Sequence, residues 1–144
     1  MIILDTNVLS ALMQQQPDPV VVSWLDAQHA ETIWISSITL FEARYGLALL
    51  ADGQRKSLLQ QRFEALIELD LADRIAMFDA RAAQLAAQLA ADRKARGRSV
   101  DMRDTFIASI ALARGARLAT RNTRHFDDLA TPVINPWTGQ EQAV

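Results

Sequence analysis

The 144-residue sequence contains no cysteine. This excludes disulfide bonds and thiolate metal sites, so any metal ion must be held by oxygen ligands or by His29 and His125, the two histidines. The sequence also has no uninterrupted apolar run of the roughly 20 residues that span a bilayer. No leader segment, with basic residues followed by an apolar run, precedes the first predicted strand at residue 2. We therefore expect a soluble, cytoplasmic protein with no membrane partner.

The length is that of one ordinary domain, and we expect residues 1–144 to form a single domain with its own core. Strand-like and helix-like patterns alternate along the chain, which favours an α/β fold with a mostly parallel sheet. The patterns predict helices over residues 8–13, 20–28, 38–50, 54–69, 79–95 and 103–113. They predict strands over residues 2–4, 32–35, 74–77, 117–119 and 133–134, and therefore a sheet of about five strands.

Polar side chains follow three of the predicted strands. Asp5 comes directly after the first, Thr120 directly after the fourth, and the strand at residues 32–35 runs into a helical stretch that carries Glu42. Asp104 opens the helical stretch that leads into the fourth strand. Because ligands of open α/β sheets bind beyond the carboxyl ends of the strands, we expect these side chains to meet at one edge.

Charge is distributed unevenly along the chain. Residues 93–124 contain nine basic and two acidic side chains, whereas the rest contains six basic and fifteen acidic ones. The net charge of −2 therefore conceals a basic segment around Asp104, which suits a substrate that carries phosphate. A solvated surface is the alternative explanation for any single arginine in this segment.

Each acid taken alone also has a structural explanation. Asp5 could cap the following helix, Glu42 could belong to a capping box that begins at Thr39, and Asp104 could favour a helix N-terminus. Only the three acids together, in this order and strand context, point to a catalytic site.

Five short motifs together resemble the PIN-domain ribonucleases. They are Asp5-Thr6-Asn7, Ser36-Ser37 with Glu42 and Gly46, the helix of residues 104–111, Thr120-Arg121-Asn122 with Phe126, and Asn135-Pro136-Trp137. Within that family the sequence is similar to the VapC toxins of type II toxin–antitoxin pairs, and more closely to their FitB-like branch. The resemblance covers residues 1–137 and implies a PIN-like three-layer α/β/α fold.

The resemblance implies a Mg²⁺- or Mn²⁺-dependent endoribonuclease with Asp5, Glu42 and Asp104 as catalytic, metal-binding carboxylates. Both ions prefer oxygen ligands. We expect hydrolysis by metal-activated water, which leaves a 5′ phosphate and a 3′ hydroxyl. Attack by the 2′ hydroxyl typically uses histidine. Of the two histidines here, we expect His29 to be structural or exposed, whereas His125, three residues past Asn122, could touch the substrate.

Several further residues are secondary candidates. The fourth acidic position of the family is Asn122 here, which puts a second metal ion in doubt. Asp101 and Asp127 are the acids that could substitute for it. Thr6 and Thr120 are candidates for supporting the carboxylates. The arginines that we expect to contact RNA are Arg98, Arg103, Arg121 and Arg124.

The resemblance also implies partners. These are an RNA substrate, a cognate antitoxin protein, and a second copy of the chain in a homodimer that could pair into a tetramer with the antitoxin. Operator DNA would be contacted only through the antitoxin. Val21, Val22, Trp24 and Leu25 are candidates for the dimer surface, with burial inside the chain as the alternative.

Three other functions stay open. The chain could be a catalytically weak PIN-type module that binds nucleic acid. It could be a response-regulator-like receiver, but the strand at residues 32–35 ends in serine and no lysine follows Lys94. It could be a DNA-cutting enzyme of the flap-nuclease class, but those are larger and richer in carboxylates.

Overall fold

The computed structural model describes residues 1–142, and these form a single six-stranded sheet flanked by helices. The strands are β1 (Ile2–Leu4), β2 (Ile33–Ser36), β3 (Ile75–Ala76), β4 (Arg117–Ala119), β5 (Val133–Ile134) and β6 (Glu141–Gln142). They lie in the order β3-β2-β1-β4-β5-β6, with all neighbours parallel except β5 and β6. The predicted α/β fold with a mostly parallel sheet is therefore confirmed.

The prediction of about five strands missed β6. After β5 the chain turns back, with the backbone N–H of Gly139 donating to the carbonyl of Asn135 at 2.7 Å. Gly139 has a φ of 71°, a left-handed conformation that glycine adopts without steric cost. The two β6 residues are polar and exposed, so the sequence shows no apolar run or alternation there. This edge strand is formed by backbone pairing with β5, and no side-chain pattern in the sequence predicts that pairing.

The helices start close to their predicted positions, and a capping side chain sets the N-terminus of each of them except α4. They are α1 (Thr6–Leu12), α2 (Pro19–Asp26), α3 (Ser37–Ala48), α4 (Gln54–Ala65), α5 (Ala80–Ala95) and α6 (Met102–Arg114). Short turns lie at η1 (Ala30–Thr32), η2 (Leu66–Asp70) and η3 (Thr123–Phe126). The single helix predicted over residues 54–69 is α4 followed by the π-helical turn η2.

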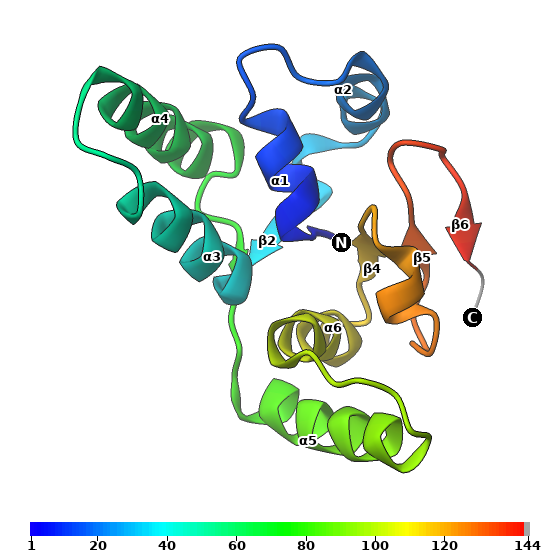
Figure 1. The fold of residues 1–144 in the computed structure, drawn as a ribbon. Coiled ribbons are helices and arrows are strands. Elements are labelled where there is room, and N and C mark those ends of the chain that lie inside the picture. Colours follow the sequence, from blue (N-terminus) through cyan, green and yellow to red (C-terminus); the bar gives the residue numbers. More distant parts are fainter. Residues whose placement is uncertain (143–144) are drawn as a thin grey trace.

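Helices cover both faces of the sheet (Figure 1). Side chains of β1 alternate between the two faces, because successive residues of a strand point in opposite directions. Ile2 and Leu4 pack in one core with residues of α1 to α4, whereas Ile3 packs in the other core with residues of α5 and α6. Two cores, one on each side of a shared sheet, give the three-layer α/β/α architecture.

Three of the four α2 residues that were candidates for a dimer surface contact the first core, as the alternative of burial inside the chain predicts. Val21 is completely buried within the chain, and Trp24 and Leu25 pack against the same core. Their apolar spacing reflects the amphipathic face of a helix that lies on a sheet. The prediction is therefore wrong for Val21. Across residues 1–142, no helix combines the length and the apolar character that crossing a bilayer requires.

Candidate active site

Polar residues meet at the carboxyl ends of three neighbouring strands. Asp5 directly follows β1, Ser36 ends β2, and Thr120 directly follows β4. Strands β2 and β4 both pair with β1 in parallel, so the three ends lie on the same edge of the sheet. The backbone N–H of Asp5 donates to the carbonyl of Ala119 at 2.8 Å and ties the ends of β1 and β4 together.

Asp5 lies at the centre of this edge and is only 5% exposed. Its Oδ1 accepts the backbone N–H of Thr6 at 2.8 Å, and its Oδ2 accepts the Thr120 hydroxyl at 2.8 Å and the Asn7 amide at 3.2 Å. Burial raises the pKa of Asp5 to about 6, against the opposing effect of the hydrogen bonds from Thr120 and Thr6, and the charges of Asp104 and Glu42 raise it further.

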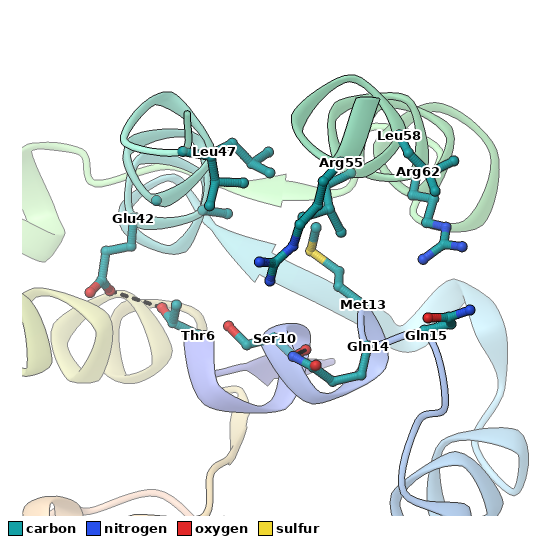
Figure 2. Close-up of a pocket in the computed structure, with 14 residues that line it drawn as sticks. Thr6, Ser10, Met13, Gln14, Gln15, Glu42, Leu47, Arg55, Leu58 and Arg62 are labelled. Carbon is teal, nitrogen blue, oxygen red and sulfur yellow. Dashed lines mark hydrogen bonds between the residues drawn. The ribbon is translucent and has the colours of Figure 1, made fainter. Parts of the chain in front are cut away.

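Glu42 reaches the same edge from α3. Its Oε1 accepts the hydroxyl of Thr6 at 2.8 Å (Figure 2). The hydroxyl oxygen of Thr6 also lies 3.0 Å from that of Thr39. The capping-box explanation for Glu42 is wrong, because α3 begins after Ser36, whose hydroxyl accepts the backbone N–H of Thr39 at 3.0 Å. Glu42 lies a turn further into the helix, where capping does not require it.

Asp104 lies in the first turn of α6, but it does not cap that helix. Asp101 is the cap, and its Oδ1 accepts the backbone N–H of Asp104 at 3.0 Å. The side chain of Asp104 instead meets His125, with 2.8 Å between Oδ2 and Nδ1. Asn122 contacts the site through its backbone N–H, which donates to the Thr120 hydroxyl at 3.0 Å.

A buried arginine holds the turn that carries His125. Both side chains of the Arg93–Asp128 pair are at most 5% exposed, and Nε and one Nη of Arg93 each donate to a different oxygen of Asp128 at 2.8 Å. Arg93 also donates to the carbonyl of His125 at 2.9 Å and to the hydroxyl of Thr105 at 3.2 Å. Thr105 follows Asp104 directly. The guanidinium of Arg93 therefore fixes the backbone at His125 and the side chain next to Asp104, which are the two sides of the Asp104–His125 contact.

The four arginines expected to contact RNA have different surroundings. Arg98 is paired with Asp127 at 2.8 Å, Arg103 lies 3.5 Å from Glu42, and the guanidinium of Arg121 lies 4.8 Å from the centre of the Trp137 ring. Arg124 is exposed and lines a hollow of about 340 Å³ that also borders Asp104 and His125. The pairing of Arg98 also gives Asp127 a partner outside the carboxylate group.

The donor chemistry of the edge fits a hard divalent cation. Asp5, Glu42 and Asp104 offer only oxygen ligands, and positive charge would relieve the repulsion that helps to raise the pKa of Asp5. Within residues 1–142, no three acidic or histidine side chains already converge as a complete ligand set. Mg²⁺ keeps several of its waters and uses only one or two carboxylates, so a complete protein cage is not required.

Sequence reasoning missed the supporting roles of Arg93, Asn7 and His125. In the sequence, Arg93 is one of several charged residues near the end of an alanine-rich helix. Its partner Asp128 is separated from it by 35 positions in sequence. Asn7 and His125 lie within or beside recognised motifs, but their hydrogen bonds join elements that only the folded chain brings together. The proximity of His125 to Asn122 in sequence was the one available signal.

The fold and this carboxylate edge define a class of protein that the family comparison identifies. The PIN domain family model matches residues 2–132, and the chain belongs to this family. It is 42% identical to VapC ribonuclease Y4jK of Sinorhizobium fredii, over 95% of this chain and 98% of the relative. It is 39% identical to Toxin FitB of Neisseria gonorrhoeae, over 95% of this chain and 99% of that toxin.

A solved structure has the same fold. It is that of FitAB bound to an IR36 DNA fragment, in which the matching chain superposes with a TM-score of 0.87 at 39% identity, over 95% of this chain and 96% of that one. The predicted resemblance to PIN-domain proteins of the VapC and FitB kind is therefore confirmed.

Proposed function

We propose that this chain is a Mg²⁺- or Mn²⁺-dependent endoribonuclease. The observation that carries the proposal is the group of Asp5, Glu42 and Asp104 at one sheet edge, where the charges of the other two acids add to the effect of burial on the pKa of Asp5. Membership of the PIN family and the ribonuclease name of the Sinorhizobium relative support it.

The chain's own residues prepare this edge. Thr120 and Asn7 orient Asp5, Thr6 orients Glu42, and His125 orients Asp104. Asp5, Glu42 and Asp104 would hold the cation between them, directly or through the waters that it keeps. When bound, the cation would supply a Lewis acid and lower the pKa of water.

We assign hydrolysis with in-line attack of water on the scissile phosphorus. The bond from phosphorus to the 3′ oxygen breaks, and that oxygen gains a proton. The products carry a 5′ phosphate and a 3′ hydroxyl. Asn122, which has no charge, leaves the acidic group with three carboxylates instead of four, and this favours one metal ion over two.

The ribonuclease would be the toxin of a type II toxin–antitoxin pair. The toxin name of the gonococcal relative and the FitAB complex with DNA support this role. We expect a cognate antitoxin to inhibit the cytoplasmic enzyme and to make the contacts with operator DNA. We also expect the chain to form a homodimer, which pairs into a tetramer in the complex.

RNA cleavage tests the enzymatic proposal. Purified protein, freed of any partner, is incubated with a panel of structured RNAs in Mg²⁺, in Mn²⁺ and in EDTA. We expect cleavage with either ion, none in EDTA, and 5′-phosphate ends. Cleavage that persists in EDTA, or 2′,3′-cyclic phosphate ends, would contradict the mechanism. RNA that is bound but left intact in both ions would favour a nucleic-acid-binding module instead.

A further inference from the structure

A groove of about 570 Å³ extends from the carboxylate edge between α1 and the pair α3 and α4. Thr6 and Glu42 form its near end, and Gln15 and Arg62 lie at its far end (Figure 2). The groove therefore continues directly from the proposed site of cleavage. Its volume is that of a site for one drug-sized molecule, which corresponds to one or two nucleotides of a single strand.

The walls of the groove combine apolar surface with two arginines. Arg55 and Arg62 both lie on α4, and their guanidinium groups point across the groove toward α1 (Figure 2). They are seven residues apart, about 10 Å along the helix axis. Apolar side chains that line the same groove offer a surface on which bases can pack without being distinguished. These are Met13, Leu47, Leu50, Leu58 and Leu59.

Arg55 and Arg62 are exposed, and neither takes part in an ion pair within residues 1–142. Neighbouring cations are paired: Arg44 with Glu64 at 2.6 Å, and Lys56 with Asp52 at 3.3 Å. Among the residues that the structure describes, Glu42 is the single acid that lines the groove. Two free guanidinium groups beside a site rich in carboxylates match a polyanion, which must be drawn toward acids that repel it.

We propose that this groove holds the single-stranded RNA that flanks the scissile phosphate, with Arg55 and Arg62 binding its phosphates. The inference rests on the proposed ribonuclease function, and it assigns the path of the substrate to one side of the carboxylates. The continuity of the groove with Glu42 and its unpaired arginines favour RNA over a protein segment as the occupant.

The test compares Arg55→Gln, Arg62→Gln and the double variant with the wild type. The matched control is Arg81→Gln, an exposed arginine on α5 across the sheet. Binding of a fluorescent single-stranded RNA is measured by anisotropy in EDTA, and KM is measured in Mg²⁺. Each phosphate contact with a single strand contributes about 0.7 to the slope of log affinity against log salt. At 0.1 M salt we therefore expect about fivefold weaker binding per arginine and about 25-fold for both.

A larger side chain on α3 can also fill the groove and test the proposal without changing an arginine. Gly46 lines it, and a Cβ added there would meet no other atom within 4 Å. Gly46→Phe should raise KM more than Gly46→Ala does, whereas kcat changes little. Thermal unfolding of every variant establishes that it is folded before RNA binding is compared.

Failure of this inference is distinct from failure of the proposed function. If wild-type protein leaves RNA intact, or cuts it in EDTA, the ribonuclease proposal fails first. If wild-type protein cuts RNA but the arginine variants bind as Arg81→Gln does, with an unchanged salt slope, the groove does not carry substrate. Arginine variants that bind RNA normally but lose affinity for a protein partner would assign the groove to that partner and overturn the inference.

Discussion

At the scale of single residues, structural and catalytic explanations coincide at Asp5. Its Oδ1 accepts the first backbone N–H of α1, as a helix cap does, while burial and two neighbouring acids raise its pKa. In α6 two residues have these two roles: Asp101 caps the helix, and the side chain of Asp104 lies at the carboxylate edge. A capping role therefore does not count against a catalytic one.

The raised pKa of Asp5 predicts how stability depends on pH in the absence of metal. Because the folded pKa of about 6 lies above the ordinary aspartate value of 3.8, the folded state binds a proton more tightly than the unfolded state, and stability is lost as pH rises through 6. Between pH 5 and 7.5, wild-type protein should lose about 1.4 kcal/mol relative to Asp5→Asn. Urea unfolding in EDTA at the two pH values measures this difference.

The control for this prediction is Glu31→Gln, which alters an exposed acid on η1 and should keep the wild-type pH dependence. Asp5→Asn should also abolish RNA cleavage. Parallel pH profiles for Asp5→Asn and wild type would show that the carboxyl of Asp5 is not perturbed by its burial.

At the scale of elements, a helix or strand could be predicted from the sequence where its signal comes from residues close together in the chain. The five parallel strands and most helix starts follow from apolar runs and capping residues close in sequence, as at Asp18 and Asp79. The strand β6 and the π-helical turn η2 have no such local signal, because pairing and packing within the folded chain decide them. The same holds for His125, whose contact with Asp104 needs η3 and α6 to meet.

The Arg93–Asp128 pair joins α5 to the segment after η3 and makes a second prediction. Arg93→Met would leave Asp128 buried with only the longer contact to Arg98, at 3.5 Å. Removing one partner of a buried ion pair typically costs about 3–5 kcal/mol of unfolding free energy, and the remaining contact should keep the loss near the lower value. The hydrogen bond from Arg93 is the main cause that holds the pKa of Asp128 below its usual value. The stability that Asp128 contributes is therefore present above its unfolded pKa and is lost as pH falls through the lower folded value.

A double-mutant cycle with Asp128→Leu separates the pair from other effects. The double variant should lose less stability than the two single losses combined, because it leaves no unpaired charge. The control is Glu141→Gln, which breaks the ion pair with Arg117. The two side chains are 37% exposed for Arg117 and 38% for Glu141, so this variant should lose less than about 1 kcal/mol of unfolding free energy. Additive losses at Arg93 and Asp128 would show that the two residues act independently.

At the scale of the whole molecule, the outer face of α3 is apolar in a way that the two cores do not explain. Phe41, Tyr45 and Leu49 are more than half exposed and follow one another at intervals of four residues. The rings of Phe41 and Tyr45 stack with centroids 5.8 Å apart. The same helix carries Glu42 into the carboxylate edge, so a protein bound along α3 would lie beside the active site.

The proposed toxin–antitoxin role makes the last prediction. Co-expression with the adjacent open reading frame should yield a complex that co-purifies and does not cleave RNA. We expect the partner to lay a C-terminal tail over the carboxylate edge, with an arginine that donates to the acids, since a guanidinium offers paired donors to carboxylates. Replacing that arginine with alanine should restore cleavage by the complex.

Asp5→Asn provides the control, because it should abolish growth inhibition in cells that lack the partner. The variant should still form the complex through contacts outside the acidic site, so binding and catalysis are read separately. Light scattering of the free chain and of the complex gives the masses that the proposed dimer and tetramer require. If the partner neither co-purifies with this chain nor suppresses its cleavage, the toxin–antitoxin role is wrong, while cleavage that depends on Mg²⁺ would still establish the nuclease.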